Sequence, residues 1–146
     1  MITSFEGKYA FLSNFYAAQV QYMNNIWPTT EHAYQAAKTL DKQEQKKIWE
    51  ACTPDDAKHL GRRVTIRADW EEVKDQIMYE IVKEKFKNPG LKRKLLNTGN
   101  EVLCEGNYWH DNYWGSCTCP KCMKVTPKNK LGKILMKVRE ELKDKE

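Results

Sequence analysis

The chain has 146 residues, and its 25 lysines and arginines outnumber its 20 aspartates and glutamates to leave a net charge of +5. This length fits one compact domain over residues 1–146, because single domains commonly contain about 100 to 150 residues. The sequence contains neither an apolar run of about 18 residues nor the pattern of a secretory leader. We therefore exclude a membrane partner and expect a soluble, cytoplasmic, monomeric protein.

Charge and cysteine content narrow the partners only weakly. A net positive charge favours a phosphate-bearing partner through long-range attraction, but a solvated helical face is the commoner reading of dispersed lysines and glutamates. The five cysteines are odd in number and irregularly spaced, which is not typical of the disulfide framework of a secreted domain. Reduced thiols or a metal site fit them better.

The N-terminal half begins with an aromatic loop at residues 11–16 and a short strand at residues 19–22. Pro28 then precedes two threonines that are suited to capping, and these predict a helix over residues 31–38 with an acidic first turn. Helical spacing and breaker residues predict the remaining elements: helices over residues 41–51, 53–61, 69–87, 91–96 and 131–142, and a strand over residues 101–105. The sum is an α+β fold, a mostly helical domain with a few short strands.

Two ionisable residues share one face of the helix over residues 31–38. Glu31 and Lys38 lie seven residues apart, which places them about 10 Å apart along the axis with Gln35 between them. Because helical side chains lean toward the N-terminus, the Lys38 amine can reach back toward Glu31. The alternative is a polar stripe facing solvent. His32 points elsewhere and is predicted to be a structural or surface residue.

Aromatic side chains crowd the predicted loop over residues 106–115, where Tyr108, Trp109, Tyr113 and Trp114 alternate with polar residues. Such a loop either plugs the core or forms a stacking pocket for a heteroaromatic ring, with Asp111 at its edge. The sequence favours neither interpretation. Two roles likewise remain possible for Trp70: it either anchors the core or forms the wall of a ligand site.

Three thiols, Cys117, Cys119 and Cys122, fall within six residues. This density suggests zinc, but a closed structural site needs four ligands, and no spacing rule selects a fourth from the nearby Cys104 and His110. We favour free thiols over a structural zinc ion. The segment follows the aromatic loop directly, so it could shape the mouth of a pocket.

Five segments together resemble the NADAR family, which includes the YbiA-like N-glycosidases. Their order and spacing cover nearly the whole chain, and the string at residues 31–38, Glu-His-Ala-Tyr-Gln-Ala-Ala-Lys, is the most specific of them. The segments are residues 11–16, 27–38, 67–70, 111–115 and 129–133.

The resemblance implies a YbiA-like α+β domain that cleaves the bond between C1′ of a ribose and a nitrogen of a base or amine, with no required cofactor. Family activities remove ribose 5-phosphate from early riboflavin-pathway intermediates, or ADP-ribose from modified guanine in nucleic acid. The resemblance implies Glu31, Lys38 and Asp111 as catalytic residues. The residues predicted to bind substrate lie in the five segments, except for Asn107 and Trp109, which come from the aromatic loop: Ser13, Asn14, Phe15, Tyr16, Trp70, Asn107, Trp109, Trp114 and Gly115.

These residue types suit the implied reaction. Breaking a C1′–N bond builds positive charge on the sugar, which the Glu31 carboxylate can stabilise. A neutral Lys38 amine can add to C1′ and hold the opened sugar as a Schiff base. Asp111 can protonate the leaving base or position water. The net positive charge leans the prediction toward ADP-ribosylated nucleic acid over a ribosylated small molecule.

Two other functions stay open at this stage. A non-catalytic reader of ADP-ribose or nucleotides needs the aromatic loop and basic residues, but it does not need the pair Glu31 and Lys38. A zinc-dependent nucleic-acid-binding protein would draw on the cysteines and the net charge. That reading is weakened by the lack of a second ligand pair at ribbon spacing and of a concentrated basic helix near the cysteines.

Overall fold

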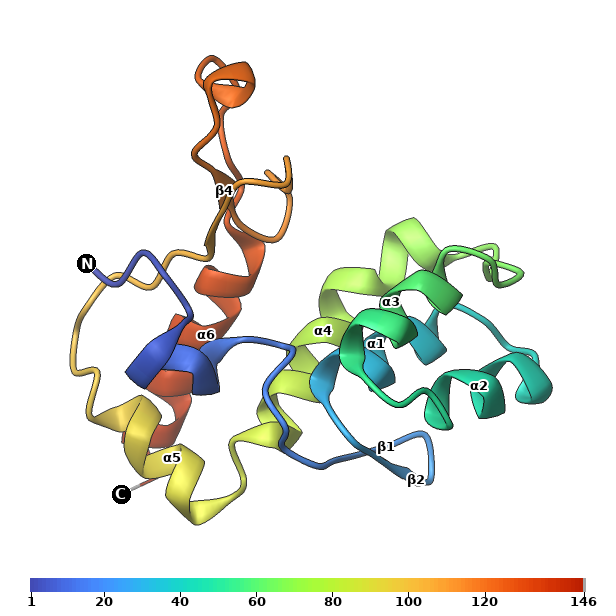
Figure 1. Ribbon diagram of the computed structural model, residues 1–146. Coiled ribbons are helices and arrows are strands. Elements are labelled where there is room, and N and C mark those ends of the chain that lie inside the picture. Colours follow the sequence, from blue (N-terminus) through green and yellow to red (C-terminus); the bar gives the residue numbers. More distant parts are fainter. Residues whose placement is uncertain (146) are drawn as a thin grey trace. The chain divides into compact units, whose positions relative to one another are not determined.

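The computed structural model describes residues 1–145 and divides into two compact units (Figure 1). We call residues Asn14–Lys87 the central unit, and residues Met1–Ser13 with Asn88–Glu146 the terminal unit. The fold class is α+β and mostly helical, as predicted. Within residues 1–145, every helix is too short or too polar to cross a membrane.

The central unit begins with a hairpin and continues as helices. Strands β1 (Val20–Tyr22) and β2 (Asn25–Trp27) pair antiparallel. Both residues of the connecting turn, Met23 and Asn24, have positive φ angles of 50° and 58°, as the tight turns that match strand twist require. The helices that follow are α1 (Thr30–Ala37), α2 (Lys42–Trp49), α3 (Pro54–Gly61) and α4 (Trp70–Lys85).

Side-chain caps set the starts of three of these helices. The side chains of Thr29, Asp41 and Thr53 accept hydrogen bonds from backbone amides in the first turns of α1, α2 and α3. Each cap satisfies an amide that has no partner within its helix. The threonine and proline signals in the sequence therefore locate these helices to within a residue or two.

Helix α1 is the centre of this unit. It packs against α2, α3, α4 and both strands (Figure 1), and all eight of its residues are buried. Its alanines, Ala33, Ala36 and Ala37, permit close approach of neighbouring helices, and each is at most 1% exposed. The polar residues on the helix are consequently enclosed with them.

The terminal unit joins the N-terminal segment to the last third of the chain. Helix α5 (Pro89–Leu96) packs on the long helix α6 (Lys130–Lys143). The 3₁₀ helix η1 (Gly7–Leu12) adds Phe11 and Leu12 to the buried residues. Between α5 and α6 lie β3 (Gly106–Asn107), β4 (Ser116–Cys117) and the 3₁₀ helix η2 (Pro120–Cys122), in a segment that projects past the start of α6 (Figure 1).

The predicted strand over residues 101–105 is wrong. Leu103 makes only an isolated parallel bridge with Ile2, and the strand pairing starts one residue later, where β3 runs parallel to β4. Residues 1–3 run beside this segment for a few bonds, such as Cys104 N to Ile2 O at 2.9 Å, and further hydrogen bonds join it to Ser116 and Asn129. Alternation of apolar residues cannot reveal how short that partner is.

Candidate active site

Glu31 is enclosed rather than solvent-facing. Glu31 is only 7% exposed, and Gln35 Nε2 donates a hydrogen bond to Glu31 Oε2 at 2.5 Å. The backbone amide of Glu31 donates to Asn14 O at 3.0 Å. A buried carboxylate requires such donors, so the interpretation of this stripe as a solvated surface is excluded for Glu31 and Gln35.

Gly61, on α3, makes room for the Gln35 side chain. A Cβ atom at Gly61 would lie 1.9 Å from Gln35 Oε1 and 2.7 Å from Gln35 Cδ. Only a residue without a side chain lets α3 approach α1 this closely. Gly61 therefore leaves the space in which the Gln35 side chain contacts Glu31. Its place at the end of the predicted helix over residues 53–61 gave no sign of this role.

Lys38 directly follows α1 as its C-terminal cap, and its environment disfavours a charged amine. Burial is the main cause that lowers the pKa of Lys38, and the cations Arg62, Lys58 and Lys74 lower it further, whereas Glu31 opposes the shift. A lowered pKa increases the fraction of neutral, nucleophilic amine at a given pH. Arg62, Lys58 and Lys74 therefore form a group of positive charges around Lys38.

Trp70 lies beside these residues through Tyr34. The Tyr34 and Trp70 rings are 5.2 Å apart at an interplanar angle of 54°, and Lys38 Nζ lies 5.9 Å from the Tyr34 ring centroid. The backbone amide of Arg67 donates to Lys38 O at 2.8 Å, which ties the start of α4 to the end of α1. The structure thus places two predicted residues, Lys38 and Trp70, at the ring of Tyr34. Tyr34 lies four residues before Lys38, so the sequence already placed the two on one helix face.

His32 has a structural role, as predicted. It is 1% exposed, and both ring nitrogens are engaged: Nδ1 with Thr29 Oγ1 at 2.8 Å and Nε2 with Ala51 O at 3.0 Å. A carbonyl oxygen can only accept, so Nε2 carries the proton. With both nitrogens occupied by the scaffold, His32 is not available as an acid or base.

The predicted binding segment over residues 13–16 is divided between the units. Phe15 is 40% exposed, and Lys58 Nζ lies 6.0 Å from its ring centroid. Asn14 Nδ2 contacts Met78 Sδ at 3.6 Å, and the Tyr16 ring faces Lys85 Nζ at 5.8 Å. Ser13 belongs to the terminal unit, where its amide donates to Ala10 O.

Asp111 and Asn107 belong to the terminal unit and hold its aromatic loop in shape. Asn107 Nδ2 donates to Asp111 O at 2.8 Å, and Asn107 Oδ1 accepts from Asp111 N at 3.2 Å. Asp111 Oδ1 in turn accepts from the backbone amides of Tyr113 and Trp114 at 3.0 and 2.9 Å. A Cβ atom at Gly115 would lie 2.1 Å from Glu105 O, so this glycine is required by backbone packing.

The aromatic side chains of this loop do not form a plug in the core. Tyr108 and Trp109 are 73% and 50% exposed, with ring centroids 5.3 Å apart. Trp114 is half-buried, and its ring lies 4.9 Å from that of Tyr113. The exposed pair fits the alternative interpretation, a surface for a stacked ring.

The cysteine cluster has a neighbour that spacing alone did not select. The side chain of His110 lies with those of Cys117, Cys119 and Cys122, and all four possible ligand atoms fall within 4.8 Å of one another. Cys104 is not a member of this group. The four residues could hold a metal ion.

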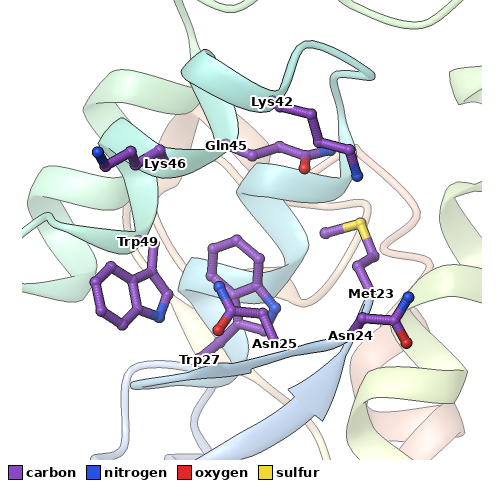
Figure 2. Close-up of a pocket in the computed structure, with 8 residues that line it drawn as sticks. All are labelled: Met23, Asn24, Asn25, Trp27, Lys42, Gln45, Lys46 and Trp49. Carbon is purple, nitrogen blue, oxygen red and sulfur yellow. The ribbon is translucent and has the colours of Figure 1, made fainter.

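A separate cavity of about 240 Å³ opens between the β1–β2 turn and α2 (Figure 2). Lys42 and Lys46 reach it from α2, and Trp27 and Trp49 line its apolar part. Both indole nitrogens are occupied by the scaffold, since Trp27 donates to Tyr22 O and Trp49 to Ile26 O. Neither Glu31 nor Lys38 lines this cavity, so it is distinct from the group around α1.

The sequence profile of the NADAR domain family matches residues 3–143. The chain belongs to the NADAR family. It is 39% identical over 142 residues to an N-glycosidase of Nostoc punctiforme, with 93% of this chain and 87% of that protein covered. It is 36% identical over 137 residues to the N-glycosidase YbiA of Escherichia coli, covering 92% of this chain and 82% of that protein.

Two further comparisons extend this assignment. A riboflavin biosynthesis protein of Vibrio vulnificus is 37% identical over 139 residues, which are 93% of this chain but 36% of that longer protein. The solved structure of Escherichia coli YbiA matches with a TM-score of 0.83 at 33% identity, covering 99% of this chain and 86% of that one. Both the sequence and the fold of this chain are therefore those of the family.

Proposed function

We propose that the chain hydrolyses the C1′–N bond of a phosphorylated ribose, with Glu31 and Lys38 as its central catalytic groups. The chain is an enzyme that acts on N-glycosyl bonds, because relatives named N-glycosidases share 36 to 39% of its residues over almost its full length. The single observation that carries the residue assignment is the burial of Glu31 on α1 beside an amine whose pKa is lowered.

Glu31 is suited to stabilise the positive charge that develops on the sugar. The Gln35 amide fixes one carboxylate oxygen, and the alanine-rich packing of α1 keeps water away from it. In a site that excludes water, a fixed charge stabilises an oxocarbenium-like transition state more than it would in bulk solvent.

Lys38 is suited to the covalent step. In its neutral form the Lys38 Nζ adds to C1′ as the bond to the leaving nitrogen breaks, and that nitrogen takes up a proton. Ring opening then converts the adduct to a Schiff base, and water hydrolyses it to release the sugar and the amine. Asp111 is proposed as the proton donor to the leaving base, on the strength of its match to the family motif.

The positive charges around Lys38 support a phosphorylated substrate. Arg62, Lys58 and Lys74 all act electrostatically on Lys38, so an anionic sugar bound near this amine would be attracted by the same field. The same cations favour a neutral amine, and one group of charges therefore serves both recognition and activation.

Two substrates remain in competition within this proposal. The net charge of +5 and the exposed rings of Tyr108 and Trp109 favour ADP-ribosylated guanine in nucleic acid, because stacking and basic charge suit such a ligand. The similarity to a riboflavin biosynthesis protein of Vibrio vulnificus favours a phosphoribosyl amine of that pathway.

The experiment compares both substrates side by side. Purified enzyme is incubated with a riboflavin-pathway phosphoribosyl amine and with an oligonucleotide carrying ADP-ribosylated guanine, and released sugar is measured by chromatography. We expect release from the oligonucleotide. Release from the amine alone would assign the other substrate, and tight binding with no release from either would support a non-catalytic reader.

Borohydride trapping tests the covalent step separately. Reduction during turnover should attach the sugar to the wild-type chain, with the mass increase located on the peptide that contains Lys38. Lys38→Arg keeps the positive charge and should abolish trapping, whereas the matched variant Lys58→Arg should retain it. Undiminished trapping in Lys38→Arg would exclude Lys38 as the amine.

A further inference from the structure

Three sulfurs of the terminal unit converge on one imidazole nitrogen. His110 Nδ1 lies 3.3 Å from Cys119 Sγ, 3.5 Å from Cys122 Sγ and 3.8 Å from Cys117 Sγ. A single ring nitrogen has one proton or one lone pair in the ring plane, so it cannot hydrogen-bond to three thiols at once. A single metal ion bound by all four side chains explains the convergence.

The separations between His110 Nδ1 and the three sulfurs match those of a tetrahedral zinc site. Zinc lies about 2.3 Å from sulfur and about 2.0 Å from nitrogen, so a tetrahedral site separates nitrogen from each sulfur by about 3.5 Å. The three measured separations of 3.3, 3.5 and 3.8 Å scatter around that value. The sulfurs are not joined in a disulfide.

The backbone is shaped to bring these side chains together. His110 has a φ of 71°, in the left-handed region that residues other than glycine rarely adopt. The parallel pairing of β3 with β4 places Asn107 opposite Cys117, and η2 turns the chain so that Cys122 N donates to Cys119 O at 3.1 Å. The amide of Cys119 also donates to Cys117 Sγ at 3.5 Å.

We propose that the chain binds one structural zinc ion through Cys117, Cys119, Cys122 and Nδ1 of His110. Three thiolates and an imidazole are soft to borderline ligands that select zinc over magnesium or calcium. Four protein ligands fill a tetrahedral shell and leave no position for water or substrate, which makes the site structural rather than catalytic.

The zinc site fixes the loop that carries Asp111. His110 precedes Asp111 directly, and Cys117 N donates to Asn112 Oδ1 at 2.9 Å. The hydrogen bonds between Asn107 and Asp111 then lie between two ligand-bearing segments. The ion joins His110, before Asp111, to Cys117, after it. It thereby supports the loop together with the short pairing of β3 with β4.

Metal analysis of the full chain tests the proposal independently of its enzymatic activity. Protein purified under reducing conditions without chelator should contain about one zinc ion per chain, as measured by inductively coupled plasma mass spectrometry. His110→Ala and Cys119→Ser should lose stoichiometric zinc. The matched variants His59→Ala, Cys52→Ser and Cys104→Ser change residues outside the cluster and should retain it.

A cobalt titration keeps the test decisive if a ligand variant fails to fold. Metal-free wild-type protein that takes up one cobalt ion with the intense visible absorption of tetrahedral thiolate coordination supports the site, and added zinc should displace it. Wild-type protein that binds neither ion in reducing buffer overturns the proposal. Retention of zinc by His110→Ala together with its loss from Cys104→Ser would overturn the ligand assignment.

Discussion

Helix α1 and the segment between β3 and α6 are held in place by different forces. All eight residues of α1 are buried against three helices and a hairpin, whereas the β3–α6 segment carries the exposed side chains of Tyr108, Trp109 and Met123. Polar contacts from Asn107, Asp111 and Asn112 support it instead. Packing therefore fixes one region, and hydrogen bonds with a proposed ion fix the other.

The largest expected effect is on catalysis at α1. Glu31→Gln removes the buried charge while keeping the shape of the side chain, and it should lower the rate of sugar release by about 100-fold or more. The exposed Glu50→Gln is the matched control and should leave the rate unchanged. Both rates are measured by chromatography, with thermal unfolding to verify the fold. A parental rate in Glu31→Gln would exclude the electrostatic role.

The next effect tests whether packing holds the α1 region. Gly61→Ala places a methyl group 1.9 Å from Gln35 Oε1 and should destabilise the fold by about 1–3 kcal/mol, as overpacking does. Gly90→Ala, in the exposed first turn of α5, should leave stability unchanged or raise it slightly. Urea unfolding measures both. Equal stability of the two variants would show that α3 can move away from α1 at no cost.

Removal of metal should affect the β3–α6 segment and leave α1 unchanged. Chelator treatment should raise the hydrogen exchange of the amides of Cys117 and Thr118, whose bonds to Asn112 Oδ1 and Asn107 O belong to the zinc-supported loop. Amides within α1 should exchange as before. Exchange mass spectrometry with and without chelator measures this, and equal loss of protection in α1 would contradict an independent role for packing.

The smallest effect concerns the pH dependence of the reaction. The Arg62 cation lowers the pKa of Lys38, so Arg62→Gln should raise that pKa. Activity that needs the neutral amine increases with pH through the pKa of Lys38, and the acid limb of kcat/KM should therefore move to higher pH. The exposed neighbour Arg63 is not among the causes of the shift. If Arg63→Gln moved the acid limb of kcat/KM by the same amount, the shift would be an effect of net charge and not of the position of Arg62.

Local signals in the sequence were sufficient for the helices. The threonines that precede α1 and α3 and the Asp41 cap of α2 act over three residues or fewer, so their effect can be predicted without knowing the rest of the fold. The strand over residues 101–105 failed for the opposite reason, because a strand exists only through its partner, and residues 1–3 offer Leu103 a single bridge.

The sequence by itself determined that Glu31, Gln35 and Lys38 share one helix face, because helical periodicity is a local property. Only the tertiary structure decided that this face is buried, since burial depends on Gly61 and on helices far along the chain. It also decided which residue joins the three cysteines. His110 and Cys104 were equal candidates by spacing, and the pairing of β3 with β4 and the left-handed backbone at His110 selected the histidine.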